Sequence, residues 1–185
     1  SPYAISKIGT DLISTFYFQA YKVKTLTTRM FTHTGPRRGD VFAESSFAKQ
    51  IAMAENGLTK NIIYVGNLNS LRTISDVRDA VEAYFMLVTK KPIFGECYNI
   101  GGNKSLTIEE ILKYLISRSS LKKKIKIIKD SKRLRPIDAD LQIPDCKKFK
   151  SHTGWSPQYN YKETLQDLLN YWRKKIKKNK NYLVR

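Results

Sequence analysis

A tyrosine and a lysine that could transfer a proton stand four residues apart at the start of the chain. Tyr3 and Lys7 open a run in which apolar residues recur at the spacing of an amphipathic helix. Residues four apart share a helical face, so the phenol and the ammonium are expected to point the same way. A free tyrosine has a pKa of about 10, and a neighbouring cation lowers it by favouring the phenolate. The pair is a candidate acid/base device, although a surface tyrosine and lysine would show the same spacing.

The elements that must position this pair alternate along the chain. Apolar periodicity and capping signals predict helices at 2–20, 43–56, 75–88, 107–116, 145–152 and 161–178. Short apolar or β-branched runs predict strands at 23–31, 61–66, 97–100 and 125–128. Alternation of this kind is typical of an α/β protein with parallel strand pairing.

A loop at 32–40 follows the first predicted strand and contains two adjacent arginines. Gly35, Pro36 and Gly39 break the strand pattern around Arg37 and Arg38. Ligands of open α/β sheets bind at the ends of strands, and guanidinium groups pair well with phosphates. The loop is therefore a candidate phosphate-binding segment.

Composition indicates a folded, soluble protein. Apolar residues make up 41% of the 185, and the sequence contains neither an apolar run of membrane-spanning length nor a signal-peptide pattern. We expect a cytoplasmic protein that does not bind a membrane. Cys97 and Cys146 are far apart, so neither a disulfide framework nor a metal site is expected.

The formal charge of +18 indicates an anionic partner or simply a lysine-rich surface. Lysines concentrate at 122–124 and, with Arg173, at 173–180. No nucleic-acid-binding module is recognisable, so nucleic acid is an unlikely partner and a phosphate-bearing small substrate fits equally well. A basic binding module without catalytic activity remains the distant alternative.

The motifs resemble those of one enzyme family in their order along nearly the whole chain. They are similar to the extended short-chain dehydrogenases/reductases (the NAD-dependent epimerase/dehydratase family), and within them to GDP-mannose 4,6-dehydratases and GDP-4-keto-6-deoxymannose reductases. The segments that carry the resemblance are Ser1-Pro2-Tyr3-Ala4 with Lys7, the loop 31–40, Phe47-Ala48-Lys49, Val65-Gly66-Asn67, Leu71-Arg72, Asp76-Val77-Arg78-Asp79, Tyr98-Asn99-Ile100-Gly101, Leu134-Arg135-Pro136 and Thr153-Gly154-Trp155.

The resemblance assigns roles to the first of these residues. Tyr3 would be the acid/base at the sugar 4-hydroxyl, and Lys7 would bind the nicotinamide ribose and tune Tyr3. His33 and Arg38 would contact the cofactor, NADP with NAD possible. A structural role for His33 in its loop is an equally good reading of the sequence.

The remaining assignments concern the substrate, a GDP-sugar. Lys49, Arg72 and Arg135 would hold it, and Thr32, which stands where the family usually has Asn, would bind it as well. A surface ion pair for Arg72 and a capping role for Arg135 stay open.

By the same resemblance, we expect the C-terminal part of a Rossmann-like enzyme with a small substrate-binding α/β subdomain. The chain begins at the active-site helix and contains no Gly-rich dinucleotide-binding turn, so the segment by itself is expected to be inactive. We expect 1–35 to hold the active-site helix and a late Rossmann strand. The region 36–185 would bind substrate and return elements to the Rossmann sheet, with 173–185 as a basic tail.

The first helix resembles the one that pairs subunits in this superfamily, which implies a homodimer or homotetramer. The activity implied first is an NADP-dependent GDP-mannose 4,6-dehydratase, a lyase with no net redox change. The alternative is a GDP-4-keto-6-deoxymannose reductase or another nucleotide-sugar epimerase or dehydratase.

Overall fold

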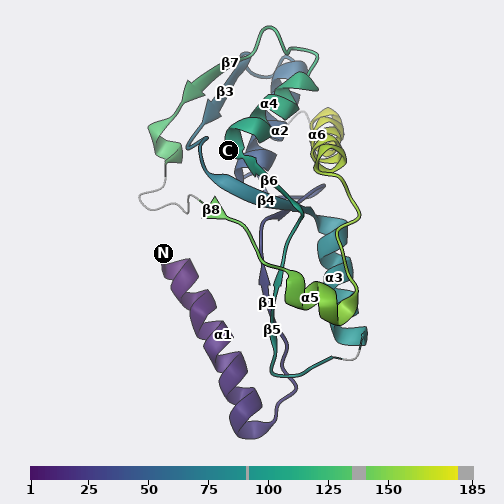
Figure 1. Ribbon diagram of the computed structural model, residues 1–185. Helices are drawn as coiled ribbons and strands as arrows, with labels where there is room; N and C mark the ends of the chain where they lie inside the picture. Colours follow the sequence, from purple (N-terminus) through teal and green to yellow (C-terminus); the bar gives the residue numbers. More distant parts are fainter. Residues whose placement is uncertain (91, 135–140, 179–185) are drawn as a thin grey trace.

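The computed structural model describes residues 1–90, 92–134 and 141–178 and contains helices and short strands in alternation (Figure 1). The helices are α1 (Pro2–Tyr21), α2 (Ala43–Glu55), α3 (Val77–Thr89), α4 (Ile108–Ser117), the 3-10 turn η1 (Ser131–Arg133), α5 (Lys147–Thr153) and α6 (Tyr161–Lys178). The strands are β1 (Thr27–Met30), β2 (His33–Thr34), β3 (Ile62–Val65), β4 (Leu71–Asp76), β5 (Cys97–Ile100), β6 (Lys104–Thr107), β7 (Lys126–Lys129) and β8 (Leu141–Gln142). The predicted α/β class is confirmed.

The described strands form three small sheets in which parallel pairing dominates. β1 pairs with β5, with Thr27 opposite Cys97, and β3 pairs with β7, with Ile62 opposite Lys126. The third sheet has the order β2-β4-β6, with β8 also paired to β4. The β4–β6 pair is antiparallel, whereas β2 and β8 run parallel to β4.

The larger core lies where α2, α4 and α6 meet β3, β4 and β6. On α6 the buried residues follow a helical stripe, because Leu165, Leu168, Leu169, Trp172 and Ile176 recur every three or four positions. The α2 face that contains Phe47 and Ile51 packs in the same cluster. These faces contain the apolar residues whose spacing predicted the two helices.

A second core joins β5 to α3 and α5. Its buried members are Ala83, Leu87, Tyr98, Ile100, Phe149 and Trp155. Gly154 ends α5 with a φ of 71°, the left-handed conformation that favours glycine at this position. β1 lies against this second core through Met30. β1, which follows the first helix, pairs with a strand seventy positions further along the chain.

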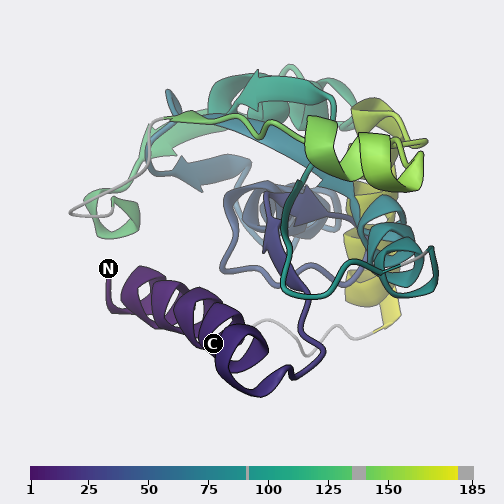
Figure 2. The same ribbon diagram turned by 60° about the horizontal axis from the view of Figure 1, so that its bottom comes forward.

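Helix α1 lies beside the β1–β5 sheet and apart from α2, α4 and α6 (Figures 1 and 2). None of its residues is buried, and Ile5 and Leu12 are 70% and 66% exposed. Polar contacts join it to the sheet, including an ion pair between Asp11 and Arg29 at 2.7 Å. The apolar periodicity thus predicted the helix correctly, while its apolar face is open in this chain.

The strand predictions were less accurate than the helix predictions. The strand expected at 23–31 is reduced to Thr27–Met30, and β2, β4, β6 and β8 were not predicted. β2 and β8 have two residues each, too few for an alternating pattern, and β4 and β6 contain many polar residues. Pairing partners therefore decide their conformation. Among the described residues, no helix is long and apolar enough to span a membrane.

Candidate active site

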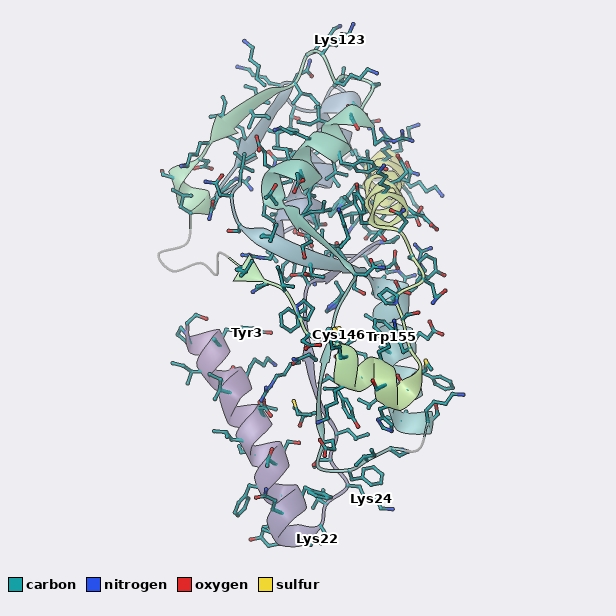
Figure 3. All side chains as sticks on the ribbon, in the orientation of Figure 1. Tyr3, Lys22, Lys24, Lys123, Cys146 and Trp155 are labelled. Carbon is teal, nitrogen blue, oxygen red and sulfur yellow. The ribbon has the colours of Figure 1, made fainter. Side chains whose placement is uncertain are left out.

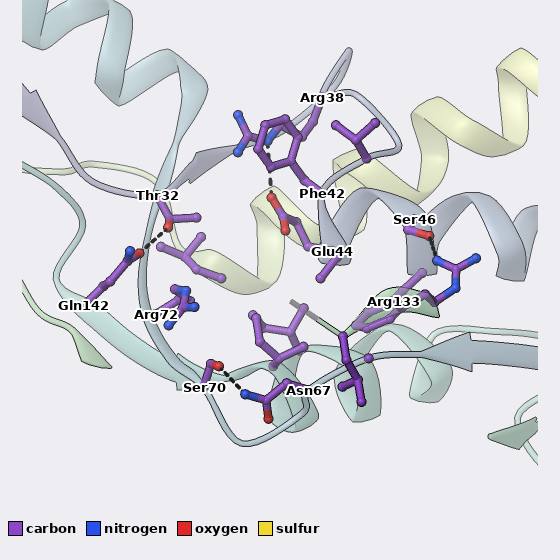
Figure 4. Close-up of a pocket in the computed structure, with 18 of the residues that line it drawn as sticks. Thr32, Arg38, Phe42, Glu44, Ser46, Asn67, Ser70, Arg72, Arg133 and Gln142 are labelled. Carbon is purple, nitrogen blue, oxygen red and sulfur yellow. Dashed lines mark hydrogen bonds and ion pairs between the residues drawn. The ribbon is translucent and has the colours of Figure 1, made fainter. Parts of the chain in front are cut away.

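A cavity of about 980 Å³ lies between the N-terminal end of α1 and the elements of the larger core (Figure 4). Segments far apart in the sequence contribute to its wall. Its polar and charged lining residues include Tyr3, Lys7, Thr32, Arg38, Glu44, Ser46, Asn67, Ser70, Arg72, Lys129, Arg133 and Gln142. Five residues chosen from the sequence as site candidates (Tyr3, Lys7, Thr32, Arg38 and Arg72) therefore share one cavity.

Tyr3 and Lys7 lie on one face of α1, as their spacing predicted. The Lys7 Nζ is 5.4 Å from the centroid of the Tyr3 ring. Ser1 caps the helix by accepting a hydrogen bond from the Ala4 N–H, and Pro2 occupies the first turn, where its missing N–H has no cost. The phenol stands at this end of the helix (Figure 3) and is 71% exposed, so a substrate can reach it.

The loop at 32–40, called the arginine loop below, presents the guanidinium of Arg38 to the cavity. Arg38 stacks on Phe42, with its Cζ 3.3 Å from the ring centroid, and its Nε lies 3.4 Å from the carboxylate of Glu44. Within the described part of the chain, the Arg38 Nε and the Glu44 Oε1 have no hydrogen-bond partner. The stack and the ion pair restrain the Arg38 side chain, whose relative exposure is 19%.

Arg72 lies on β4 and lines the same cavity as Arg38 (Figure 4). Its Nη1 donates to the Leu71 carbonyl at 3.0 Å. Gln142 of β8 stands opposite it in the strand register and accepts a hydrogen bond from the Thr32 hydroxyl at 3.4 Å. This pairing places Thr32, Arg72 and Gln142 next to one another in the wall.

Arg133 is a cavity residue that sequence reasoning missed. Its Nη1 donates to the Ser46 hydroxyl at 3.1 Å, and its Nε lies 3.5 Å from a carboxylate oxygen of Asp130. The sequence signal for this residue was the pair of arginines at 133 and 135. The family resemblance assigned a role only to Arg135. Arg135 itself lies outside the described residues.

Two other candidates lie away from the cavity lining. Lys49 donates to Asp40 at 2.5 Å, and its Nζ is 5.5 Å from the centroid of the Trp172 ring. His33 sits in β2 with its Nδ1 3.2 Å from the Phe31 carbonyl oxygen. Their roles in substrate and cofactor binding stay predictions.

The cavity is strongly basic. Among its described lining residues, five are cations (Lys7, Arg38, Arg72, Lys129 and Arg133) and one, Glu44, is a carboxylate. A concave site lined by one sign of charge concentrates ligands of the opposite sign. The donor set fits the phosphates of a nucleotide cofactor and of a nucleotide-sugar, because guanidinium and ammonium groups bind phosphate oxygens with charge-assisted hydrogen bonds.

The fold and site define a class of protein, the Rossmann-like nucleotide-sugar enzymes of the extended short-chain dehydrogenase/reductase type. Two solved structures share the fold: RMD of Pseudomonas aeruginosa complexed with NADPH (TM-score 0.83, 27% identity) and dTDP-glucose 4,6-dehydratase of Bacillus anthracis in complex with NAD (TM-score 0.79, 24% identity). They are matched over 95% and 96% of this chain and 57% and 53% of theirs. The model of the GDP-mannose 4,6 dehydratase family matches residues 1–168, and the chain belongs to this family.

Curated relatives agree with this family. GDP-6-deoxy-D-mannose reductase of Pseudomonas aeruginosa is 27% identical over 96% of this chain and 57% of its own length. GDP-mannose 4,6 dehydratase 2 of Arabidopsis thaliana is 29% identical over 90% of this chain and 44% of its own length. The chain thus spans about half the length of the curated relatives it matches.

Proposed function

We propose that the protein containing this chain is a GDP-mannose 4,6-dehydratase that uses NADP, with NAD as a possible substitute. The observation that carries the proposal is the Tyr3–Lys7 pair at one end of a basic cavity. Membership of the family and the NADPH held by the similar Pseudomonas structure support it. We further propose that the protein is cytoplasmic.

Tyr3 takes the proton from the sugar 4-hydroxyl as that carbon is oxidised. The cofactor, when bound, would accept the hydride from C4 and later return it to C6. The ketone formed at C4 acidifies the neighbouring C5 proton, so this proton and the C6 hydroxyl leave as water. Return of the hydride to C6 and of a proton to C5 then completes the 4-keto-6-deoxy sugar. Tyr3 is exposed, so the substrate can reach its hydroxyl. Lys7, on the same helical face, holds a positive charge beside the phenol.

The site residues predicted from the sequence divide between the two ligands. Arg38 and His33 contact the cofactor, while Arg72, Lys49 and Arg135 bind the diphosphate or ribose of the GDP-sugar, with Thr32 as a further substrate contact. Arg133 joins this second group because it lines the same cavity as Lys129 and Arg72. Because phosphate–guanidinium pairs are charge-assisted, they supply affinity without taking part in the proton transfer.

A second candidate is a GDP-4-keto-6-deoxymannose reductase, in which Tyr3 protonates the 4-keto oxygen instead. Similarity to the Pseudomonas reductase over 96% of this chain favours this alternative. Both activities use the same Tyr3–Lys7 pair, so they differ in substrate and in net redox change rather than in this part of the site.

A mass-spectrometric assay separates the two candidates. The intact protein is incubated with GDP-mannose and a catalytic amount of NADP, and the nucleotide-sugar mass is followed. Loss of one water without net cofactor reduction supports the dehydratase. An unchanged mass, with NADPH consumed once the 4-keto-6-deoxy sugar is supplied, assigns the reductase, and no reaction in either assay contradicts both.

A gel-shift assay tests the remaining alternative, a basic module without catalytic activity. Such a module would bind nucleic acid tightly at low salt, with an affinity that falls steeply as salt is raised. Absence of a shift at low salt removes this alternative.

We also propose a homodimer or homotetramer. The exposed apolar residues of α1 support it, because a large exposed apolar face is typical of an interaction surface. Sedimentation of the intact protein as a monomer at micromolar concentration would contradict it.

A further inference from the structure

The backbone of the arginine loop is connected to helix α6 by two consecutive hydrogen bonds, one buried and one partly buried. The indole Nε1 of Trp172 on α6 donates to the Ser45 hydroxyl at 2.9 Å. That hydroxyl donates in turn to the Arg38 carbonyl oxygen at 2.7 Å. Trp172 is 4% exposed and Ser45 is fully buried, so water does not compete for the bond between them.

These two hydrogen bonds matter for the loop because the backbone next to Arg38 is held by a hydrogen bond within the loop itself. Arg37 has a φ of 74°, the left-handed region that is unfavourable for an arginine, and the Arg38 N–H bonds back to the Gly35 carbonyl at 3.1 Å. The guanidinium of Arg38 stacks on Phe42 within the same loop. A shift of the Arg38 backbone would therefore carry the guanidinium with it.

A second contact connects the same tryptophan to the loop. Lys49 and Lys175 place their ammonium groups 5.5 and 4.9 Å from the Trp172 ring, and Lys49 forms an ion pair with Asp40. The indole is thus connected to Arg38 through Ser45 and to Asp40 through Lys49. The family model matches residues 1–168 of the chain, so Trp172 lies beyond the matched stretch.

We propose that Trp172 and Ser45 are positioning residues that hold the Arg38 backbone so that its guanidinium faces a phosphate of the nucleotide cofactor. The proposal rests on the proposed function, in which Arg38 binds that phosphate. Neither Trp172 nor Ser45 lines the cavity, so both act on the ligand only through Arg38.

The test measures the dissociation constant of NADP for the intact protein and its variants by titration calorimetry. Trp172→Phe keeps one aromatic six-membered ring and removes the pyrrole part of the indole with its N–H. Ser45→Ala removes the hydroxyl between helix and loop. Loss of one neutral hydrogen bond corresponds to a change of about three- to tenfold in an equilibrium constant, and each variant is expected to weaken NADP binding by about that factor. Tyr171→Phe, the neighbouring aromatic residue on α6, is the matched control and should bind as the parent protein does.

Combination with Arg38→Ala distinguishes positioning from a general structural role. Arg38→Ala alone should weaken NADP binding, and adding Trp172→Phe or Ser45→Ala to it should weaken binding no further. A further loss in the double variants would overturn the proposal, because these residues would then act independently of Arg38. Unchanged affinity in both single variants, with Arg38→Ala weakened, would also overturn it and leave the proposed function intact. Unchanged affinity in Arg38→Ala would refute the cofactor role of Arg38 itself.

Discussion

Tyr3 stands at one end of the basic cavity, with the Lys7 ammonium beside its ring. The hydroxyl is the only polar atom of its side chain, so its removal tests the proton-transfer role with little change in shape. The cationic residues on the other walls have a different role, because fixed positive charge attracts and orients phosphates. The two kinds of residue should therefore differ in the kinetic constant that their substitution changes.

Tyr3→Phe should abolish turnover and spare nucleotide-sugar affinity. Acid/base catalysis by a positioned side chain is worth roughly a hundred- to ten-thousandfold in rate, and the phenyl ring keeps the apolar contacts of Tyr3. Turnover measured at saturating substrate, together with calorimetric affinity for the GDP-sugar, checks the expectation. Tyr17→Phe, on the same helix and outside the cavity lining, provides the control. Retained turnover in Tyr3→Phe would refute the assignment.

Arg72→Ala should weaken GDP binding and have a smaller effect on turnover at saturation. A hydrogen bond to a charged group is worth about 1.5 to 3 kcal/mol, which corresponds to roughly a ten- to hundredfold loss of affinity. Titration of the intact protein with GDP measures this loss. Lys113→Ala, a cation paired with Glu109 on the exposed face of α4, should leave the affinity unchanged. Equal affinity in the two variants would return Arg72 to a structural role.

At the scale of the element, end-capping interactions set where helices begin. Thr107 and Glu110 form a complete capping box at the start of α4: the Thr107 hydroxyl accepts from the Glu110 N–H at 3.1 Å, and the Glu110 carboxylate accepts from the Thr107 N–H at 2.7 Å. The hydrogen bonds that the carboxylate accepts, first from the Thr107 N–H and second from the Thr107 hydroxyl, lower the pKa of Glu110. The helix that they begin supplies Ile111, Leu112 and Leu115 to the larger core.

Thr107→Ala should lower the free energy of unfolding by about 1 kcal/mol, the usual cost of losing a side-chain cap. The Glu110 N–H loses its side-chain partner at the helix start, where no intrahelical carbonyl replaces it. Urea denaturation measures the change. Lys113→Ala on the same helix should change the free energy of unfolding much less, since its ion pair is exposed. A loss in Thr107→Ala no greater than in this control would contradict the capping role.

At the scale of the whole molecule, a buried carboxylate joins three elements. Asp76 ends β4, caps α3 and accepts a hydrogen bond from Thr164 of α6 at 2.7 Å. The guanidinium of Arg78 donates to both of its oxygens at 2.8 Å. Burial raises the pKa of Asp76, but the hydrogen bonds from Arg78 and Thr164 outweigh it, and the net pKa lies below the ordinary value.

This network should make stability depend on acid pH. Because the pKa of Asp76 is lower in the folded state than its unfolded value of about 3.9, the stabilisation is present above about pH 4 and is lost as pH falls through the folded pKa. Thr164→Val should cost about 1.5 to 3 kcal/mol at neutral pH, the worth of a hydrogen bond to a charged group. The difference from the parent protein should narrow below about pH 4.

Urea denaturation at several pH values checks this dependence. Thr89→Val is the matched control, because the Thr89 hydroxyl donates to the Phe85 carbonyl, which does not titrate. Its effect on the free energy of unfolding should not vary with pH. An equally pH-independent effect of Thr164→Val would contradict the stabilising role of ionised Asp76.

The sequence by itself determined the features that are encoded locally. The capping box at Thr107, the glycine stop at Gly154 and the apolar stripe of α6 all act within a few residues, so the helices were predicted closely. The shared face of Tyr3 and Lys7 follows from helical geometry alone. The alternation of helices and strands was sufficient for the α/β class.

Only the tertiary structure decided features that depend on residues distant in the chain. β2 and β8, with two residues each, are too short to carry a pattern, and their pairing with β4 makes them strands. The partners of long cationic side chains depend on what lies next to them in space: Lys49 binds Asp40, whereas Arg133 binds Ser46 and lines the cavity. The link from Trp172 through Ser45 to Arg38 spans more than 130 positions, and no local pattern encodes it.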